Sequence, residues 1–530
     1  MFLKLREYWN WKGPFNVEEK LQKKLLNNMV FLFLLISAGI LTLLTYNHRY
    51  PYTIPLVYLV WLIPIYDMFD SIIYIDKYRR SRKYRYRLFN NGNNSNKNKK
   101  YRIAAFVVSY NEDPEMVKGT LISVLTAARS YGSCDVFLLD DSTDENIVAE
   151  LKSFCEEKGI TYLHRLSRRG FKAGAINDAL AKYAKYYDLV AIFDADQRPK
   201  PEFFHVVTPY FSDPSIAFVQ VPQNYTETYT KIAEGAKYQQ IPFLRVIMRG
   251  RNLVSAPSLG SGTIFRISAL EKIKKIKGDR VEYLREDVIT EDAATSLELF
   301  AKGFKSIYID TDLIWYGEPP QDLHAYLAQQ GRWSFGYFQL SKDLLRLDLP
   351  LITFLDYLAG LIYWIRLGFL RLIEFLAPFI FVNMGLVFIK LNPVLYMIIY
   401  LPMYIGMLLL YILTPRGYGF KGFFLHKTVE ILAFPAVLSS FIKWITKRKV
   451  SFKVTPKGKK NYWKSSWAIK MLSISIYIII LILLIPIVIY GLIKILYNTS
   501  LIFSVAVVVN VFWSLNFIPF LIYGIKISLE

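Results

Sequence analysis

The sequence predicts an α/β domain inserted into a helical membrane domain, and three observations support this fold class. The chain of 530 residues contains six apolar windows close to the length of a membrane-spanning helix. Between the second and third windows, at about residues 101–348, short apolar segments alternate with amphipathic segments, as strands and helices do in α/β domains. The composition combines 53% hydrophobic residues with a formal net charge of +22, which is typical of a membrane protein with basic cytoplasmic loops.

The apolar windows are expected to form three pairs of transmembrane helices. These pairs are residues 29–46 with 53–75, residues 371–388 with 394–413, and residues 468–492 with 501–525. Residues 351–367 and 430–445 are also apolar, but charge, Gly or Pro interrupts them. We expect these two segments to lie on the membrane surface, with a further spanning pair as the alternative.

The basic residues predict the orientation of the chain. Lys and Arg are dense at residues 77–87 and between the fourth and fifth windows, whereas the opposite connections are short and nearly uncharged. We therefore expect a multi-pass protein of the plasma membrane with its α/β domain and both termini in the cytoplasm. Nucleic acid is not an expected partner, because the basic residues flank apolar windows rather than recognition motifs. The two cysteines provide no disulfide framework.

The expected units follow from these boundaries. They are a cytoplasmic N-terminal segment (1–28), a transmembrane pair (29–76), a basic and polar linker (77–100), the α/β domain (101–348), an interfacial helix with a second transmembrane pair (349–414), a cytoplasmic loop (415–467) and a C-terminal transmembrane pair (468–530).

Within the α/β domain, continuous apolar strands between amphipathic helices indicate a mostly parallel sheet that is covered on both faces. The predicted strands are residues 102–109, 134–141 and 188–196, and the predicted helices are residues 113–130, 144–159 and 172–186. Polar clusters lie at three strand ends, at residues 109–113 (SYNED), 140–141 (DD) and 194–196 (DAD). Because ligands of such sheets bind beyond the carboxyl ends of the strands, the sequence predicts a site there.

Asp194 and Asp196 indicate one kind of ligand. Alternate carboxylates share one side of an extended chain and repel each other unless a positive partner lies between them. A hard divalent cation, Mg²⁺ or Mn²⁺, held together with phosphate oxygens is such a partner. A solvated turn is the alternative, because Asp-x-Asp alone is a weak signal. The absence of Walker, zinc-type Cys/His and Gly-x-Ser-x-Gly patterns argues against a nucleotide hydrolase, a zinc enzyme and a serine hydrolase.

Two later segments carry further candidate side chains. Thr290-Glu291-Asp292 precedes an amphipathic helix, and Glu291 could belong to its N-terminal cap. Gln329, Arg332 and Trp333 share one face of a helix at positions i, i+3 and i+4. Arg332 could hold a diphosphate and Trp333 a sugar ring, whereas the alternative is a membrane-surface helix with an anchoring Trp.

In this order, the four motifs resemble the D, D, D, QxxRW signature of processive family-two glycosyltransferases, which include cellulose, chitin and hyaluronan synthases. The motifs are Asp140-Asp141, Asp194-Ala195-Asp196, Thr290-Glu291-Asp292 and Gln329-x-x-Arg332-Trp333. FKVTPKG at residues 452–458 is similar to the FxVTxK gating loop of bacterial cellulose synthases, and RRGFKAGAINDAL at residues 168–180 is similar to the KAG segment of that family. The resemblance implies a GT-A-like, Rossmann-like domain. The sequence ends soon after the last window, so regulation by a cyclic-di-GMP-sensing barrel is not expected.

The resemblance also implies roles for individual residues. The nucleotide-sugar donor, expected to be UDP-linked, would be bound by Ser109, Tyr110, Glu112, Asp140, Asp141, Lys172 and Asp194. Asp194 and Asp196 would hold Mg²⁺ or Mn²⁺, and Asp292 would act as the general base of an inverting transfer. Gln329, Arg332 and Trp333 would hold the diphosphate and the acceptor sugar. Phe452, Val454, Thr455 and Lys457 would close over the nucleotide as a lid.

The implied partners are the donor, a growing polysaccharide, the lipid bilayer and an export or accessory subunit. Aromatic residues are candidates for stacking on a translocated polymer, with membrane anchoring or packing as the alternative; they are Tyr357, Tyr363, Trp364, Phe375 and Trp444. Two other functions remain open, namely transfer of one sugar to a polyprenyl phosphate or another lipid, and a non-enzymatic channel with a decayed transferase domain. FKVTPKG together with QxxRW favours a processive synthase over the first, and the complete set of carboxylates argues against the second.

Overall fold

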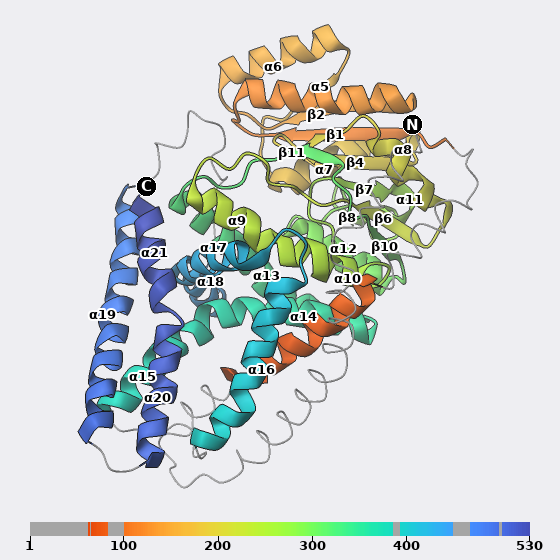
Figure 1. The fold of residues 1–530 in the computed structure, drawn as a ribbon. Coiled ribbons are helices and arrows are strands. Elements are labelled where there is room, and N and C mark those ends of the chain that lie inside the picture. Colours follow the sequence, from red (N-terminus) through yellow and green to blue (C-terminus); the bar gives the residue numbers. More distant parts are fainter. Residues whose placement is uncertain are drawn as a thin grey trace.

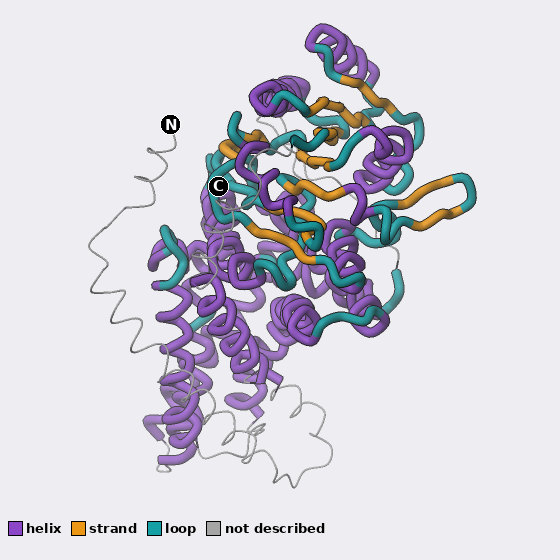
Figure 2. The backbone as a smooth tube through the Cα atoms, turned by 90° about the vertical axis from the view of Figure 1, so that its right-hand side faces the viewer, coloured by secondary structure: helices purple, strands orange, loops and turns teal. Residues whose placement is uncertain are grey.

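The computed structural model describes residues 62–63, 65–82, 100–384, 393–448, 467–497 and 501–529. These residues form two regions, an α/β domain at the top of Figure 1 and a region of long helices below it. The turned view of Figure 2 shows the same division, with the strands gathered in one region and helices filling the other.

Within the described residues, a seven-stranded sheet has the order β10-β6-β7-β4-β1-β2-β3. Its strands are β1 (Ile103–Ser109), β2 (Cys134–Asp140), β3 (Thr161–His164), β4 (Leu189–Asp194), β6 (Ile216–Gln220), β7 (Thr263–Arg266) and β10 (Lys305–Tyr308). β7 runs antiparallel to both of its neighbours, and the other pairs are parallel. The prediction of a mostly parallel sheet is therefore confirmed, with one antiparallel strand in its middle.

Helices cover both faces of this sheet, as the continuous apolar strands predict. Along β1, Ile103, Ala105 and Val107 belong to one buried cluster, and Ala104 and Phe106 belong to another on the opposite face. The helices of the domain are α5 (Pro114–Tyr131), α6 (Glu145–Lys158), α7 (Phe171–Tyr183), η3 (Ala184–Tyr186), α8 (Phe203–Val207), η4 (Thr208–Ser212), α11 (Ile267–Leu270) and α12 (Glu291–Ala301). Two small antiparallel pairs join β5 (Arg198–Pro199) to β11 (Ile314–Tyr316) and β8 (Lys275–Lys277) to β9 (Arg280–Glu282).

Local capping explains where the first helices begin. Asp113 accepts a hydrogen bond from the backbone N–H of Glu115, and Pro114 occupies the first position of α5, where its missing N–H costs nothing. Asp144 accepts bonds from the N–H groups of Asn146 and Ile147, so α6 begins where the sequence predicts a helix to start. These starts place the connections after β1 and β2 at the same edge of the sheet.

The helical region is built from elements within residues 231–251 and from elements after residue 322. They are α9 (Lys231–Pro242), η5 (Phe243–Met248), α10 (Arg249–Arg251), α13 (Leu323–Arg346), α14 (Leu351–Ile365), η6 (Arg366–Leu370), α15 (Arg371–Met384), α16 (Pro393–Leu413), α17 (Gly419–Leu432), α18 (Phe434–Ile445), α19 (Trp467–Tyr497), α20 (Leu501–Leu515) and α21 (Ile518–Leu529). Residues 65–82 form a further helix before the domain.

Three helices in the described part of the chain are long and apolar enough to cross a membrane, namely Val394–Leu413, Ile469–Tyr497 and Ser504–Leu529. They correspond to three of the six predicted spans. Residues 29–46 lie outside the described residues, and residues 53–75 and 371–388 lie partly outside them. The prediction of six spans is therefore not confirmed.

Two predicted apolar segments of this region belong to longer helical stretches. α17 and α18 meet at 43° and together are long and apolar enough to cross a membrane, and the placement of residues 430–445 on the membrane surface stays a prediction. Residues 351–384 form one helical run in which the π-helical η6 joins α14 to α15. The charge at Arg366 that suggested a break is accommodated because Arg366 pairs with Asp67 at 3.3 Å and with Glu374.

The α/β domain packs directly on the helical region, because Leu340 and Leu344 of α13 belong to the buried cluster on one face of the sheet. Within the helical region, Gly235 lets α9 approach α17 closely, because a Cβ at this position would lie 2.4 Å from Val429 Cγ1. The buried Lys77, from the helix that precedes the domain, pairs with the buried Asp356 of α14 at 2.5 Å. This ion pair joins helices that come before and after the α/β domain in the sequence.

Candidate active site

The structure brings the three predicted polar clusters together at one edge of the sheet. Across the β1–β2 pair Ser109 lies opposite Asp140, and across the β1–β4 pair Val108 lies opposite Asp194. The carboxyl ends of three adjacent parallel strands therefore meet here, in the position where α/β sheets bind ligands.

The Asp140-Asp141 pair is held by protein groups. Asp140 is fully buried and accepts hydrogen bonds from Ser142 N at 3.0 Å, Ser142 Oγ at 2.6 Å and Tyr162 OH at 2.8 Å. Asp141 accepts two bonds from Arg165, from Nε at 2.8 Å and from Nη2 at 2.6 Å. Both carboxylates thus fix the turn after β2 and the segment that carries Arg165.

Ser109 and Tyr110 lie at the end of β1 with groups suited to a ligand. Among the described residues, no hydrogen-bond partner reaches the buried Ser109 hydroxyl. The guanidinium of Arg168 covers the Tyr110 ring at 3.4 Å from its centroid, which shows that a flat group fits against this ring. Glu112 follows after Asn111, whose φ of 49° turns the chain away from the strand.

Lys172, in the first turn of α7, connects two parts of the site. Its Nζ donates to Asp194 Oδ1 at 2.5 Å and to the carbonyl oxygen of Gly260 at 2.7 Å. Burial lowers the pKa of Lys172, but the carboxylates of Asp194, Glu291 and Asp292 outweigh burial and raise it overall. Lys172 is therefore a permanent cation among several carboxylates.

Glu291 and Asp292 occupy the first turn of α12. Thr290 makes no side-chain capping hydrogen bond, whereas the helix N-terminus favours the two carboxylates that follow it. Burial raises the pKa of Asp292 to about 6, helped by Asp194 and opposed by the Ala293 N–H and Lys172. Burial also raises the pKa of Glu291 to about 7, and the charge of Asp292 adds to this effect.

Gly260 shows how closely these groups approach one another. A Cβ added to Gly260 would lie 3.1 Å from Asp292 Oδ2 and 3.3 Å from Lys172 Nζ. The Asp292 carboxylate, the Lys172 ammonium and the carbonyl that holds it therefore surround one small space, and a methyl group would enter that space.

The residues of α13 face the same site. Gln329 Nε2 donates to Tyr225 OH at 3.2 Å. Burial lowers the pKa of Arg332, while Asp194, Tyr225 and Glu291 act in the opposite direction, so the guanidinium lies within the field of the site carboxylates. Trp333 is partly buried against the core of the helical region. Gln329 and Arg332 thus join the strand ends to the long helices.

A divalent cation fits the charges of this site. In the part of the chain that the structure describes, the carboxylates of Asp194, Glu291 and Asp292 outnumber the two cations, Lys172 and Arg332, that interact with them. The same residues contain no group of three or more His, Cys, Asp or Glu side chains able to hold a metal ion alone. This agrees with Mg²⁺-type sites, which use one or two carboxylates together with substrate phosphates. Asp196 is buried beside Asp194 in the chain.

The other predicted residues have different positions. Phe452, Val454, Thr455 and Lys457 lie outside the described residues. The aromatic candidates pack against protein groups: Tyr357 against the Arg251 guanidinium, Phe375 against Phe434 and Phe517, Trp364 against Tyr337 and Tyr363, and Trp444 against Phe338 and Phe441. These contacts favour the packing interpretation over sugar stacking.

Sequence reasoning missed several residues that shape the site. Gly260 and Ser261 come from the segment SLGSG, whose glycines at 260 and 262 have φ of 81° and 63°. Its Gly-Ser-Gly pattern before a strand is a turn signal that could have indicated close backbone approach. Arg165 and Tyr225 carry no recognisable pattern, and only the fold places them here.

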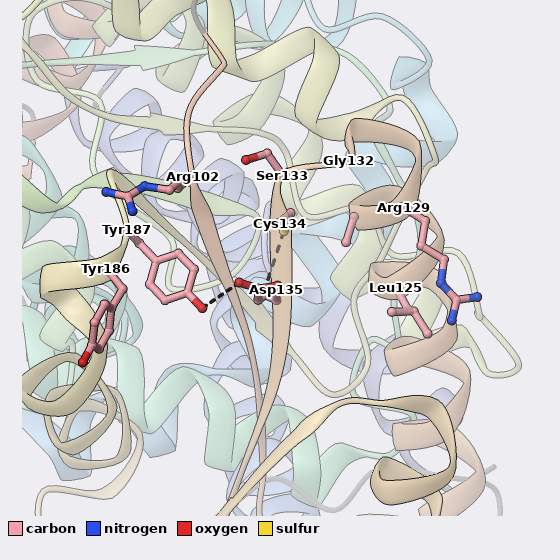
Figure 3. Close-up of a pocket in the computed structure, with 10 residues that line it drawn as sticks. Arg102, Leu125, Arg129, Gly132, Ser133, Cys134, Asp135, Tyr186 and Tyr187 are labelled. Atoms are coloured by element: carbon pink, nitrogen blue, oxygen red, sulfur yellow. Dashed lines mark hydrogen bonds between the residues drawn. The ribbon is translucent and has the colours of Figure 1, made fainter.

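A surface hollow of about 630 Å³ lies elsewhere (Figure 3). Its lining includes Arg102 and Cys134, which precede β1 and begin β2, and Asp135, whose carboxylate accepts the Tyr187 hydroxyl at 2.8 Å. These residues mark the amino ends of the strands, opposite the carboxylates, so this hollow is not part of the candidate active site.

Comparisons with known proteins show which families resemble this chain. Residues 101–336 match the family model described as glycosyltransferase like family 2. The chain is 30% identical over 261 residues to the UDP-forming cellulose synthase catalytic subunit of Xanthomonas axonopodis pv. citri, covering 47% of this chain and 33% of that protein. It is 31% identical over 217 residues to the probable glucomannan 4-beta-mannosyltransferase 3 of Oryza sativa subsp. japonica, covering 39% of this chain and 38% of that protein. The alignments thus span about a third of the length of these relatives.

A solved mannosyltransferase from Pyrobaculum calidifontis, in complex with GDP-Man and Mn²⁺, superposes with a TM-score of 0.48 at 14% identity, covering 72% of this chain and all of that one. The mixed sheet and the family match give the domain a GT-A-like fold. Residues 101–336 therefore form a glycosyltransferase family 2 domain, and the relatives of this domain include cellulose synthase catalytic subunits.

Proposed function

We propose that this protein polymerises sugars from a nucleotide-sugar donor, UDP-linked in the first instance, into a β-linked polysaccharide and passes the product across the membrane. The observation that carries the proposal is the convergence of Lys172, Asp194 and Asp292 around Gly260 at the carboxyl ends of the strands. The related proteins include UDP-forming cellulose synthases and a glucomannan mannosyltransferase, both named for polysaccharides.

The donor would lie along the strand ends. Ser109, Tyr110 and Glu112 would contact the nucleoside, with the buried Ser109 hydroxyl and the flat face of Tyr110 as the supporting features. Asp140 and Asp141 would act by fixing the turn beneath it. Lys172 would bring a positive charge to the diphosphate, since its ammonium is held by Asp194 and Gly260 at the same edge.

Asp194 and Asp196 would hold Mg²⁺ or Mn²⁺ together with phosphate oxygens. When bound, the cation supplies positive charge that stabilises the diphosphate as it leaves. Arg332 adds a fixed cation on the same side, because its field reaches Asp194 and Glu291. The remaining excess of carboxylate charge leaves Asp292 suited to accept a proton.

Asp292 would take the proton of the acceptor hydroxyl while that oxygen bonds to the anomeric carbon and the carbon–phosphate oxygen bond breaks. A single carboxylate base with direct displacement inverts the anomeric configuration, so an α-linked donor gives a β-linked product. Gln329 and Trp333 would orient the terminal sugar of the acceptor. Phe452, Val454, Thr455 and Lys457 would cover the bound nucleotide and exclude water.

Translocation is supported by the position of the domain on the helical region. α13 carries Gln329 and Arg332 and packs along α18, which belongs to the bent pair of apolar helices. A polymer that grows at Asp292 would therefore begin beside helices suited to a membrane.

The experiment that tests this function is donor supply to the purified protein in detergent or lipid nanodiscs with Mn²⁺ or Mg²⁺. Labelled UDP-glucose, UDP-N-acetylglucosamine, UDP-glucuronate and GDP-mannose are supplied separately, and products are sized and digested with linkage-specific glycosidases. We expect a high-molecular-weight product sensitive to a β-glycosidase from one donor. A product with a single sugar on a lipid would show that the protein is a lipid glycosyltransferase and not a polymerase. The absence of transfer from every donor would contradict the proposal.

A further inference from the structure

A buried turn at residues 258–263 holds two side chains of the site. The carbonyl oxygen of Gly260 accepts the Lys172 ammonium at 2.7 Å. The hydroxyl of Ser261 accepts the backbone N–H of Asp194 at 2.9 Å. The position of this turn therefore sets where the lysine and the first carboxylate of the Asp-x-Asp motif stand.

The same turn is tied to the helix that carries the base. The hydroxyl of Ser296, one helical turn after Asp292, accepts the backbone N–H of Ser258 at 2.9 Å and donates to the carbonyl oxygen of Asp292 at 2.7 Å. Together with the close approach of Gly260 to Asp292, this makes the turn the common support of both sides of the reaction space.

The side chain of Gln220, the last residue of β6, is hydrogen-bonded to this turn. Its Nε2 donates to the carbonyl oxygens of Val221 at 2.7 Å and Ser261 at 2.8 Å. Its Oε1 accepts the backbone N–H of Leu259 at 2.7 Å and the hydroxyl of Thr263. The side chain is fully buried, so none of it can reach a substrate.

Only a side-chain amide of this length satisfies all of these partners. A carboxylate would face the carbonyl oxygens of Val221 and Ser261 without a proton to donate. A thioether of similar volume, as in Met, would leave the Leu259 N–H and the Ser261 carbonyl buried without their partner, at a substantial desolvation cost. The residue type at position 220 is thus chemically specified by the turn.

We propose that Gln220 is a positioning residue for glycosyl transfer, because it fixes the turn that places Lys172, Asp194 and Asp292 relative to one another. The inference rests on the proposed function only for the roles of those three residues. Gln220 acts through the turn and shares no contact with the reacting groups.

The test compares Gln220→Met with Gln321→Met in the full-length protein. Gln321 is a matched control, because its buried amide also bridges loop backbone, accepting Tyr229 N at 3.1 Å and donating to the carbonyl oxygen of Glu227 at 2.5 Å, yet it does not touch the 258–263 turn. Displacement of reacting groups by about 1 Å can cost about 10²-fold in rate. We expect Gln220→Met to lower kcat on that scale with a much smaller change in donor KM, and Gln321→Met to keep kcat near the parental value.

Hydrogen exchange provides a readout that does not depend on activity. The backbone N–H of Leu259 bonds directly to Gln220, so peptides that cover residues 257–263 should exchange faster in Gln220→Met and at the parental rate in Gln321→Met. If the parent protein transfers no sugar, the proposed function is contradicted. The exchange rates of residues 257–263 would then still show whether Gln220 holds the turn. Parental kcat in folded Gln220→Met, with or without faster exchange, would overturn the positioning role.

A second variant keeps the test decisive if Gln220→Met does not fold. Ser261→Ala leaves Gln220 and its bonds in place and removes only the hydroxyl that holds Asp194 N. A reduced kcat with little change in KM supports transmission through the turn. Parental kcat in Ser261→Ala would overturn it.

Discussion

The α/β domain and the helical region differ in how their buried charges are balanced by opposite charges. At the strand ends, Asp194, Glu291 and Asp292 share Lys172 and Arg332, and the pKa values of the two carboxyls on α12 rise because of burial and the charge of Asp194. Such an arrangement is costly without a ligand and typical of functional sites. The domain therefore keeps negative charge available at one edge.

In the helical region, several buried charges of the described residues form ion pairs. Lys77 meets Asp356 at 2.5 Å, and Arg371 meets Glu374 at 2.7 Å in a group that also includes Arg366 and Asp67. Paired charges of this kind specify how helices align more than they add stability. The comparison indicates that the candidate active site is the place where several carboxylates share too few cations. Matched ion pairs are found instead where structural elements of the protein contact one another.

The largest effect is expected at the base. Asp292→Asn keeps the shape of the side chain but cannot accept the hydroxyl proton, so transfer should fall by about 10²- to 10⁴-fold. Labelled-sugar incorporation measures the loss, and UDP binding and thermal unfolding should stay near parental. Glu298→Gln, further along α12 and paired with Lys275 and Arg285, is the matched control and should remain active. Near-parental turnover of Asp292→Asn would remove Asp292 from its role.

Gly260→Ala tests whether the reaction space is as narrow as the structure indicates. The added methyl would lie close to Asp292 and Lys172, and we expect kcat to fall by about 10²-fold. Gly303→Ala separates backbone strain from filling, because Gly303 has φ of 82°, close to the 81° of Gly260, and nothing within 4 Å of the added carbon. Equal losses in both variants would show that strain, and not the space at Gly260, is responsible.

Lys77→Met tests the buried ion pair that joins the helix before the α/β domain to α14. It leaves the carboxylate of Asp356 buried without the Lys77 ammonium, which should lower the free energy of unfolding by about 3–5 kcal/mol. Lys118→Met is the control, because Lys118 pairs with Glu115 and Glu150 near the surface of α5, where such pairs contribute about 0–1 kcal/mol. Thermal unfolding in detergent measures both variants. If the two variants lose the same free energy of unfolding, the buried ion pair contributes no more to stability than the surface pairs do.

The pH dependence of activity is expected to be smaller but diagnostic. Asp292 must be deprotonated to act, and its pKa is raised to about 6, so kcat/KM should fall as pH decreases through this value. An ordinary aspartate, with a pKa of about 4, would stay active to much lower pH. Initial rates between mildly acidic and mildly basic pH, at saturating metal, give the profile. Full activity well below pH 6 would contradict a raised pKa in the working enzyme.

The strands and the strand-end clusters could be predicted from the sequence because local patterns determine them. Continuous apolar runs ending in Asp194 and Asp140 gave both the sheet and its ligand edge. The antiparallel β7 was not predicted, since its four residues, Thr263–Arg266, are too short to show their direction. Gln220 was missed for a related reason: its partners lie on a turn about 40 residues away, and only the fold brings them together.

The helical region was predicted less well, because a hydropathy window does not show which charged residues form ion pairs in the folded protein. Arg366 suggested an interruption, yet Asp67 and Glu374 accommodate it inside one helical run. Residues 430–445 were predicted as a separate apolar segment, and α18 over these residues follows α17 in a bent pair. Hydropathy windows therefore identified the apolar segments but not the residues at which the helices end or bend.

The most direct test of the central claim is calorimetric titration of UDP into the purified protein with and without Mn²⁺. If the shared carboxylates hold a cation with the diphosphate, the parent should bind UDP much more tightly with Mn²⁺, and Asp196→Ala should lose most of that gain because a ligand oxygen is removed. Asp287→Asn, which alters a carboxylate paired with Arg285 away from the strand ends, should retain it. Equal Mn²⁺ dependence in the parent and in Asp196→Ala would show that the cation is held elsewhere.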